Sequence, residues 1–151
     1  MSVNHGDAIV QLANDARRRI REITPAELAK FKQLPLIIDV REKDEFIKGH
    51  IEGAKNSSRG VLEQNGSQIA PDLSTSILVY CADGTRGALA AESLQKMGYQ
   101  NVFSLKGGLT SWLEAGGLVE TSKNCEVQRR VQQRFITGAR RVVADHLASD
   151  K

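Results

Sequence analysis

The stretch SILVYCADGTRGALAAESLQKM, residues 76–97, joins an apolar run to an amphipathic run through a short polar loop. Residues 76–80 are continuously apolar after Ser76, which is typical of a parallel strand covered on both faces. The second run predicts a helix from Gly87 to Met97 with an apolar inner side, made of Leu89, Ala90, Leu94 and Met97. A buried strand that leads directly into a helix indicates an α/β fold.

The loop begins at Cys81, directly after the predicted strand. Backbone N–H groups between a strand end and a helix N-terminus can turn inward and form an anion cradle, supported by the helix dipole. Such a cradle stabilises a thiolate, the form of cysteine that attacks sulfur donors. The candidate cradle residues are Ala82, Asp83, Gly84, Thr85, Arg86 and Gly87. Taken alone, the position of Cys81 favours a small buried residue at a strand end, and only the neighbouring motifs reverse this interpretation.

The sequence on either side of this stretch continues the alternation of strands and helices. Thr24, Pro25 and Glu27 form a capping box with proline at the first helical position. We predict strands at 20–23, 36–40, 76–80 and 101–104, a turn and short strand within 49–57, and helices at 7–18, 25–32, 44–48, 59–64, 87–97 and 110–115. The first helix has an apolar face, made of Ile9, Leu12, Ala13 and Ala16.

Residues 125–148 have apolar side chains at steps of three and four, which predicts a long amphipathic helix. Its outer face is basic and carries Arg129, Arg130, Arg134, Arg140 and Arg141. We expect the apolar face to pack on the domain or on a second copy of the chain. Membrane binding is less favoured, because valine and alanine dominate that face. The predicted organisation is a helical extension at 1–19, a domain at 20–117 and a basic helical extension at 118–151.

Length and composition place the chain among ordinary globular proteins. It has 151 residues, of which 40% are hydrophobic and 26% charged. No run of about 18 apolar residues could span a bilayer. The first twenty residues have neither the apolar core nor the cleavage site of a secretory signal. We therefore expect a soluble cytoplasmic protein.

The cysteines, histidines and charges exclude several other classes. Two cysteines, Cys81 and Cys125, are too few for a disulfide framework, and a single disulfide between them is disfavoured. Cys125 is more simply a spectator thiol than an acceptor of sulfur from Cys81. The three histidines lack metal-site spacing, so we expect neither a metal nor a cofactor. Residues 1–119 hold 14 basic and 14 acidic side chains, and residues 120–151 hold 7 and 4. A balanced body argues against a nucleic-acid surface.

Four motifs in order resemble those of a rhodanese-homology domain, along residues 20–117. They are DVRE at 39–42, GHIEGAKN at 49–56, CADGTR at 81–86 and LKGGLTSW at 105–112. The resemblance implies a central, mainly parallel five-stranded sheet with helices on both faces, to which this chain adds N-terminal and C-terminal helices.

The resemblance also implies an activity. Cys81 would attack a sulfane-sulfur donor such as thiosulfate or a persulfide, and would pass the sulfur to cyanide, a small thiol or a protein thiol. Arg86 would help to hold the anionic donor or persulfide. Four residues separate Cys81 from Arg86. Related dual-specificity phosphatases have five, so phosphatase activity is less favoured.

Some alternatives stay open at this stage. Rhodanese-like domains also serve as non-catalytic binding or sensory modules, although the intact Cys81, Gly84 and Arg86 argue against that role here. The negative charge of Asp83 and the glycine at 87, where serine is often found, make thiosulfate a doubtful donor.

The other motifs suggest structural roles more than catalytic ones. We expect a structural role for Asp39, a turn-closing role rather than general-base catalysis for His50, and packing against the sheet for Trp112. Arg41 could pair with a carboxylate or face the catalytic pocket.

Overall fold

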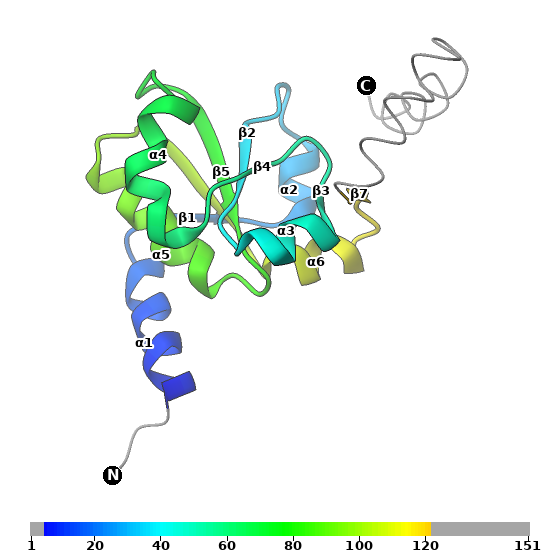
Figure 1. Ribbon diagram of the computed structural model, residues 1–151, viewed down its shortest axis with the longest axis horizontal. Coiled ribbons are helices and arrows are strands. Elements are labelled where there is room, and N and C mark those ends of the chain that lie inside the picture. Colours follow the sequence, from blue (N-terminus) through cyan, green and yellow to red (C-terminus); the bar gives the residue numbers. More distant parts are fainter. Residues whose placement is uncertain (1–4, 122–151) are drawn as a thin grey trace.

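The computed structural model describes residues 5–121, and these form one α/β unit (Figure 1). In chain order the helices are α1 His5–Arg17, α2 Pro25–Ala29, α3 Lys43–Lys48, the 3₁₀ turn η1 Arg59–Val61, α4 Leu62–Ile69, α5 Thr85–Lys96 and α6 Gly108–Glu114. The strands are β1 Arg21–Ile23, β2 Leu36–Asp39, β3 His50–Ile51, β4 Lys55–Asn56, β5 Ser76–Tyr80, β6 Asn101–Leu105 and β7 Val119–Glu120.

Five of the strands form a parallel sheet in the order β1-β6-β5-β2-β4. This confirms the predicted fold class, a parallel five-stranded sheet with helices around it. The most apolar strand, β5, lies at the centre, between β6 and β2. The carboxyl ends of parallel strands meet at one edge of a sheet, which is where binding and catalytic groups gather in open α/β folds.

Side chains of β5 alternate between two hydrophobic clusters, one on each face of the sheet. Ile77 and Val79 pack with residues of α4 and α5, whereas Leu78 and Tyr80 pack with residues of α2 and α6. All four are at most 1% exposed. Burial on both faces explains why the run 77–80 is continuously apolar rather than alternating.

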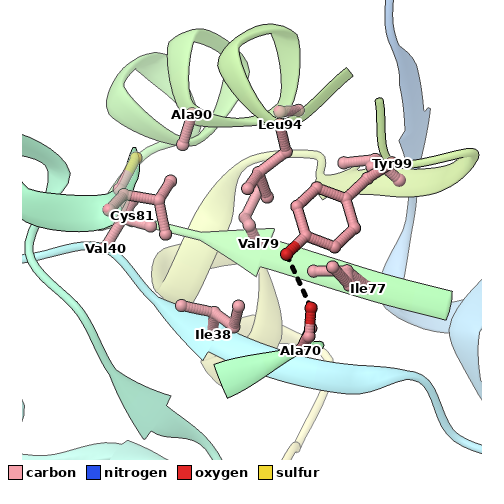
Figure 2. Packing of buried hydrophobic residues seen from close by; sticks show 12 residues of the cluster. Ile38, Val40, Ala70, Ile77, Val79, Cys81, Ala90, Leu94 and Tyr99 are labelled. Carbon is pink, nitrogen blue, oxygen red and sulfur yellow. Dashed lines mark hydrogen bonds between the residues drawn. The ribbon is translucent and has the colours of Figure 1, made fainter. Parts of the chain in front are cut away.

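Cys81 lies in the cluster on the α4 and α5 side (Figure 2). On that side Ala90 and Leu94 of α5 are fully buried, as the helix pattern predicted, whereas Met97 is 36% exposed. Tyr99 fills the end of the cluster, and its hydroxyl donates to the Ala70 carbonyl at 2.6 Å. The cysteine is therefore part of a close-packed layer, and its backbone position is fixed by that layer.

Helix α1 packs along α5 through small residues. Ala13 and Ala16 are fully buried against Ala88 of α5. The prediction that the apolar face of α1 is buried was wrong for its two large residues: Ile9 is 39% exposed and Leu12 is 60% exposed. Alanines permit the close approach of two helices, and the larger side chains therefore lie outside the contact.

Two further features separate the sequence prediction from the structure. The short strand β7 was not predicted, and it pairs antiparallel with β3, with His50 opposite Glu120 and Ile51 opposite Val119. The single helix predicted at 59–64 is instead the 3₁₀ turn η1 followed by α4, which extends to Ile69. The predicted helix at 125–148 and Cys125 lie outside the described residues. Within 5–121, no helix has the length and apolar character needed to cross a membrane.

Candidate active site

Cys81 follows the last residue of β5, and its sulfur accepts two backbone hydrogen bonds. The donors are the N–H groups of Gly84 at 3.1 Å and Gly87 at 3.2 Å. These two amides point inward from the loop and from the first turn of α5, as an anion cradle requires. The Cys81 side chain is fully buried, so a donor reaches the sulfur only when the loop opens or the thiol rotates outward.

Glycine suits the two cradle positions for different reasons. Gly84 has a φ of +101°, a conformation that a side chain disfavours, and it begins α5. Gly87 has an ordinary backbone but lies against the sheet. A Cβ at Gly87 would lie 3.1 Å from the Ser104 hydroxyl and 3.5 Å from the Cys81 nitrogen. A serine at position 87, which the resemblance led us to expect, would therefore need a different local packing.

The start of α6 holds the loop from the other side. The Leu109 N–H donates to the Cys81 carbonyl at 2.8 Å, and the Thr110 N–H donates to the Ala82 carbonyl at 3.1 Å. A Cβ at Gly108 would lie 2.8 Å from the carbonyl carbon of Ala82. The glycine pair at 107 and 108 thus lets a helix N-terminus approach the loop backbone directly, a role that the sequence prediction missed.

Asp83 is exposed at the top of the loop, and Thr85 determines its orientation. Its Oδ1 accepts the Thr85 N–H at 3.1 Å and the Thr85 hydroxyl at 2.7 Å. These hydrogen bonds hold the pKa of Asp83 below its usual value, with Arg86 adding a smaller effect. The same oxygen lies 3.8 Å from the Cys81 sulfur. A negative charge therefore stands beside the sulfur, as the sequence indicated.

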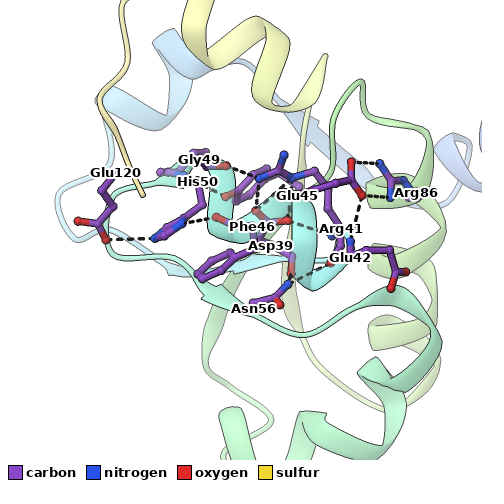
Figure 3. Close-up of polar contacts among 12 residues, drawn as sticks. Asp39, Arg41, Glu42, Glu45, Phe46, Gly49, His50, Asn56, Arg86 and Glu120 are labelled. Carbon is purple, nitrogen blue, oxygen red and sulfur yellow. Dashed lines mark hydrogen bonds and ion pairs between the residues drawn. The ribbon is translucent and has the colours of Figure 1, made fainter. Parts of the chain in front are cut away.

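Arg86 forms a bidentate ion pair with Glu45 of α3 (Figure 3). The distances are 2.9 Å from Nη1 to Oε1 and 3.1 Å from Nη2 to Oε2. This pairing with Arg86 is the main reason why the pKa of Glu45 falls to about 2. The loop arginine is thus already balanced by a carboxylate. Glu45 was missed because nothing in the spacing of residues 45 and 86 reveals that they meet.

Arg41 pairs with Asp39, one of the two roles considered for it. The guanidinium contacts both carboxylate oxygens of Asp39, with the shortest distance at 2.8 Å, and Nη2 also donates to the Gly49 carbonyl at 2.6 Å. Asp39 is fully buried and Arg41 nearly so. Asn56 donates to the carbonyls of residues 39 and 41 at 3.0 Å each. Arg41 thus connects the end of β2 to Gly49, which precedes β3, and Asn56 connects it to β4 (Figure 3).

His50 and Trp112 have the contacts of structural residues. The His50 ring stacks on Phe46 at 3.7 Å between centroids, with Nδ1 at 2.8 Å from the Phe46 carbonyl and Nε2 at 3.3 Å from Glu120. Trp112 packs with the cluster on the α2 side of the sheet and donates its indole N–H to the Leu118 carbonyl at 2.9 Å. In the part of the chain that the structure describes, no group of three or more potential ligands is placed to hold a metal.

Comparison with known proteins identifies the family of the chain. Residues 24–115 match the rhodanese-like domain family. The uncharacterized Bacillus subtilis protein YqhL is 34% identical over 107 residues, covering 71% of this chain and 81% of its own length. The thiosulfate sulfurtransferase GlpE of Shewanella oneidensis is 35% identical over 79 residues, covering 52% of this chain and 76% of its own.

A solved structure has a similar fold. It is a Rhodopseudomonas palustris protein of unknown function, described as a possible tyrosine phosphatase. It superposes with a TM-score of 0.68 at 28% identity and covers 80% of this chain and 99% of that chain. On its fold, its motifs and the match over residues 24–115, the chain belongs to the rhodanese-like domain family.

Proposed function

We propose that this chain is a sulfurtransferase that carries sulfane sulfur as a persulfide on Cys81. The observation that supports the proposal most strongly is the pair of backbone N–H groups that donate to the Cys81 sulfur, from Gly84 and Gly87. Neutral amides fixed in a loop stabilise a thiolate or a persulfide anion without a counter-charge that would have to move during the reaction. Sulfurtransferase relatives such as the Shewanella protein support the same class of reaction.

In the first step the Cys81 thiolate attacks the outer sulfur of a donor. With a persulfide R–S–SH, the bond between the two donor sulfurs breaks, a Cys81–S–SH forms and the thiolate R–S⁻ leaves. With thiosulfate, the products are Cys81–S–S⁻ and sulfite. In either case the outer sulfur moves without a net change in electrons, so no external oxidant or reductant is needed.

In the second step an acceptor thiolate attacks the outer sulfur of the Cys81 persulfide. A new persulfide forms on the acceptor, and the Cys81 thiolate leaves with the electron pair of the broken bond. Two acceptors fit this chemistry: a small thiol, and a thiol on a protein. Because Cys81 is buried, opening of the loop or outward rotation of the side chain would precede both steps.

The charges around the loop favour a persulfide over thiosulfate as donor. Arg86, the cation that would attract a dianion, is paired with Glu45, and the Asp83 carboxylate lies 3.8 Å from the sulfur. A donor with two negative charges would meet repulsion from Asp83, whereas a protonated persulfide would not. The same balance disfavours phosphatase activity, which needs a free arginine and a wider loop for phosphate.

Intact-mass measurement after incubation with a donor tests the proposal. A low-molecular-weight persulfide should add one sulfur to the wild-type chain, on the peptide that contains Cys81, and Cys81→Ser should gain nothing at that peptide. Cys125→Ser is the matched control and should load like the wild type. If no donor, including thiosulfate, adds sulfur to Cys81, the proposal is wrong and a non-catalytic binding or sensory module becomes the better account.

A further inference from the structure

The ring of His50 has an acceptor on each of its two nitrogens (Figure 3). Its Nδ1 lies 2.8 Å from the carbonyl oxygen of Phe46 in α3, and its Nε2 lies 3.3 Å from Oε1 of Glu120 in β7. The ring also stacks on the Phe46 ring, with an angle of 8° between the two planes. The His50 side chain is only 3% exposed, so water has little access to either contact.

The two acceptors determine which protonation state of His50 fits the structure. A backbone carbonyl only accepts, so Nδ1 carries a proton and donates it to Phe46. In a neutral ring, Nε2 would then present its lone pair to the Glu120 carboxylate, which also only accepts. In an imidazolium both nitrogens donate, and the contact with Glu120 becomes a charge-assisted hydrogen bond. The geometry therefore fits a charged His50 and an ionised Glu120.

The other charged groups near the ring favour the same state. Glu52 follows β3 and lies near Glu120: burial, and then the Glu120 carboxylate, raise the pKa of Glu52. Arg41, at the end of β2, is balanced by its ion pair with Asp39. Lys48, at the end of α3, is exposed. Carboxylates thus dominate the surroundings of the ring and stabilise a positive charge on it.

Strand β3 is anchored in the domain, whereas β7 is attached to its surface. Ile51 of β3 is 1% exposed, and its N–H donates to the Tyr80 hydroxyl at 3.0 Å. Val119 of β7 is 43% exposed and the preceding Leu118 is 37% exposed. The Leu118 carbonyl accepts the indole N–H of Trp112 at 2.9 Å. A strand of two residues without a fully buried side chain opens at a low free-energy cost, so a single ion pair can decide how often it opens.

From these contacts we propose that His50 and Glu120 form a pH-sensitive ion pair that holds β7 against β3. While the ring is charged, the pair keeps β7 in place. When Nε2 loses its proton to solvent, its lone pair faces the carboxylate, and β7 separates from β3 more often. The inference concerns β7, the last element that the structure describes, and does not depend on the chemistry of Cys81.

Trp112, the only tryptophan of the chain, reports on β7 through its hydrogen bond to Leu118. NMR of the full chain measures the exchange rate of this indole N–H, corrected for the intrinsic dependence of exchange on pH. The corrected rate should rise about tenfold between about pH 5 and pH 8, because one charge-assisted hydrogen bond is lost. A corrected rate that does not change over this range would overturn the inference.

The ¹⁵N chemical shifts of the His50 ring, recorded on the same samples, test the assigned protonation states. They should show protons on both ring nitrogens at the lower pH and on Nδ1 alone at the higher pH. A ring that is already neutral at the lower pH, where the indole N–H exchanges slowly, would contradict a charged pair.

Glu120→Gln is the decisive variant. The amide oxygen of glutamine can accept from a protonated Nε2, and its N–H can donate to a bare Nε2, so both states of His50 keep a partner. The corrected indole exchange rate should then stay near the slow wild-type value at both ends of the pH range.

Glu52→Gln is the matched control, because it removes the neighbouring carboxylate and leaves both contacts of His50 in place. It should keep the tenfold rise of the wild type. A rise that survives in Glu120→Gln, or that disappears in Glu52→Gln, would overturn the inference.

Discussion

The loop around Cys81 and the charged side chains beside it are stabilised by different interactions. In the loop, neutral backbone N–H groups contact the sulfur. Beside it lies what we call the paired-charge network, in which carboxylates and guanidiniums contact one another: Asp39, Arg41, Glu45 and Arg86. The difference teaches that the ion pairs of this network stabilise the structure around the loop, whereas the backbone amides of the loop contact the reacting sulfur of Cys81. Changes in the network should mainly alter stability, and changes in the loop should mainly alter chemistry.

The largest expected effect is the loss of stability on breaking the buried pair in the network. Asp39→Ala leaves the Arg41 guanidinium, whose side chain is 7% exposed, without its carboxylate. Such uncompensated burial costs about 3–5 kcal/mol of unfolding free energy. Urea unfolding measures the loss. Asp15→Asn, in an ion pair exposed by 58% at the aspartate, is the control and should unfold like the wild type. A loss below about 1 kcal/mol for Asp39→Ala would contradict a structural role for this pair.

Gly108→Ala tests whether the close contact between the start of α6 and the loop backbone at Ala82 is rigid. The new Cβ would press on the Ala82 carbonyl group at 2.8 Å, at a φ of +58°. We expect a loss of about 2 kcal/mol or more in unfolding free energy, together with slower loading of sulfur onto Cys81.

Gly53→Ala separates the clash from the backbone strain at Gly108. Gly53 also has a positive φ, +83°, but open space where the Cβ would be. Its substitution should cost about 1 kcal/mol and leave the loading of sulfur unchanged. Equal unfolding free energies for Gly53→Ala and Gly108→Ala would show that the loop backbone moves to accommodate the new Cβ, and would contradict a rigid contact with α6.

The ion pair of Glu45 with Arg86 should give a pH-dependent stability difference. Arg86 lowers the pKa of Glu45 from 4.5 to about 2, so the pair stabilises the fold above pH 4.5 and loses this effect as the pH falls toward 2. Because the Glu45 side chain is 36% exposed, Glu45→Gln should cost only about 1 kcal/mol at neutral pH.

Unfolding of Glu45→Gln and the wild type across this pH range measures the difference. The two curves should converge between pH 4.5 and pH 2. Curves that stay parallel down to pH 2 would mean that the pair does not stabilise the fold.

The smallest expected effect is electrostatic and lies in the loop itself. Asp83→Lys replaces the negative charge 3.8 Å from the sulfur and should raise the rate of loading from thiosulfate by about threefold, with little gain for a protonated persulfide. Asp72→Lys is a close control, because Asp72 accepts from the N–H and hydroxyl of Ser74 as Asp83 does from Thr85. An unchanged or lower rate with thiosulfate in Asp83→Lys would remove the electrostatic argument about the donor.

Much of the fold could be predicted from the sequence, because local patterns encode it. The continuous apolar run at 77–80 identified the central strand, and the capping box at Thr24 and Glu27 is present in the structure. The cradle could also be anticipated, since it depends on the order of strand, cysteine, glycine and helix within a few residues.

What could not be predicted depends on contacts between distant segments. Glu45 meets Arg86 across 41 positions, and Ala13 and Ala16 of α1 meet Ala88 of α5 across more than 70. Strand β7 has two residues, so no periodicity marks it. The exposure of Leu12 shows the same limit, because an apolar face predicts burial only where a partner surface exists.

Single-turnover transfer tests the central claim most directly. The wild-type chain is loaded with a persulfide donor, freed of excess donor and mixed with a thiol, and the sulfur on the Cys81 peptide and on the acceptor is measured by mass spectrometry over time. The account predicts that one sulfur per chain leaves Cys81 and appears as a persulfide on the acceptor, with no transfer from Cys81→Ser. Sulfur that never loads onto Cys81, or that stays there in the presence of the thiol, would contradict it.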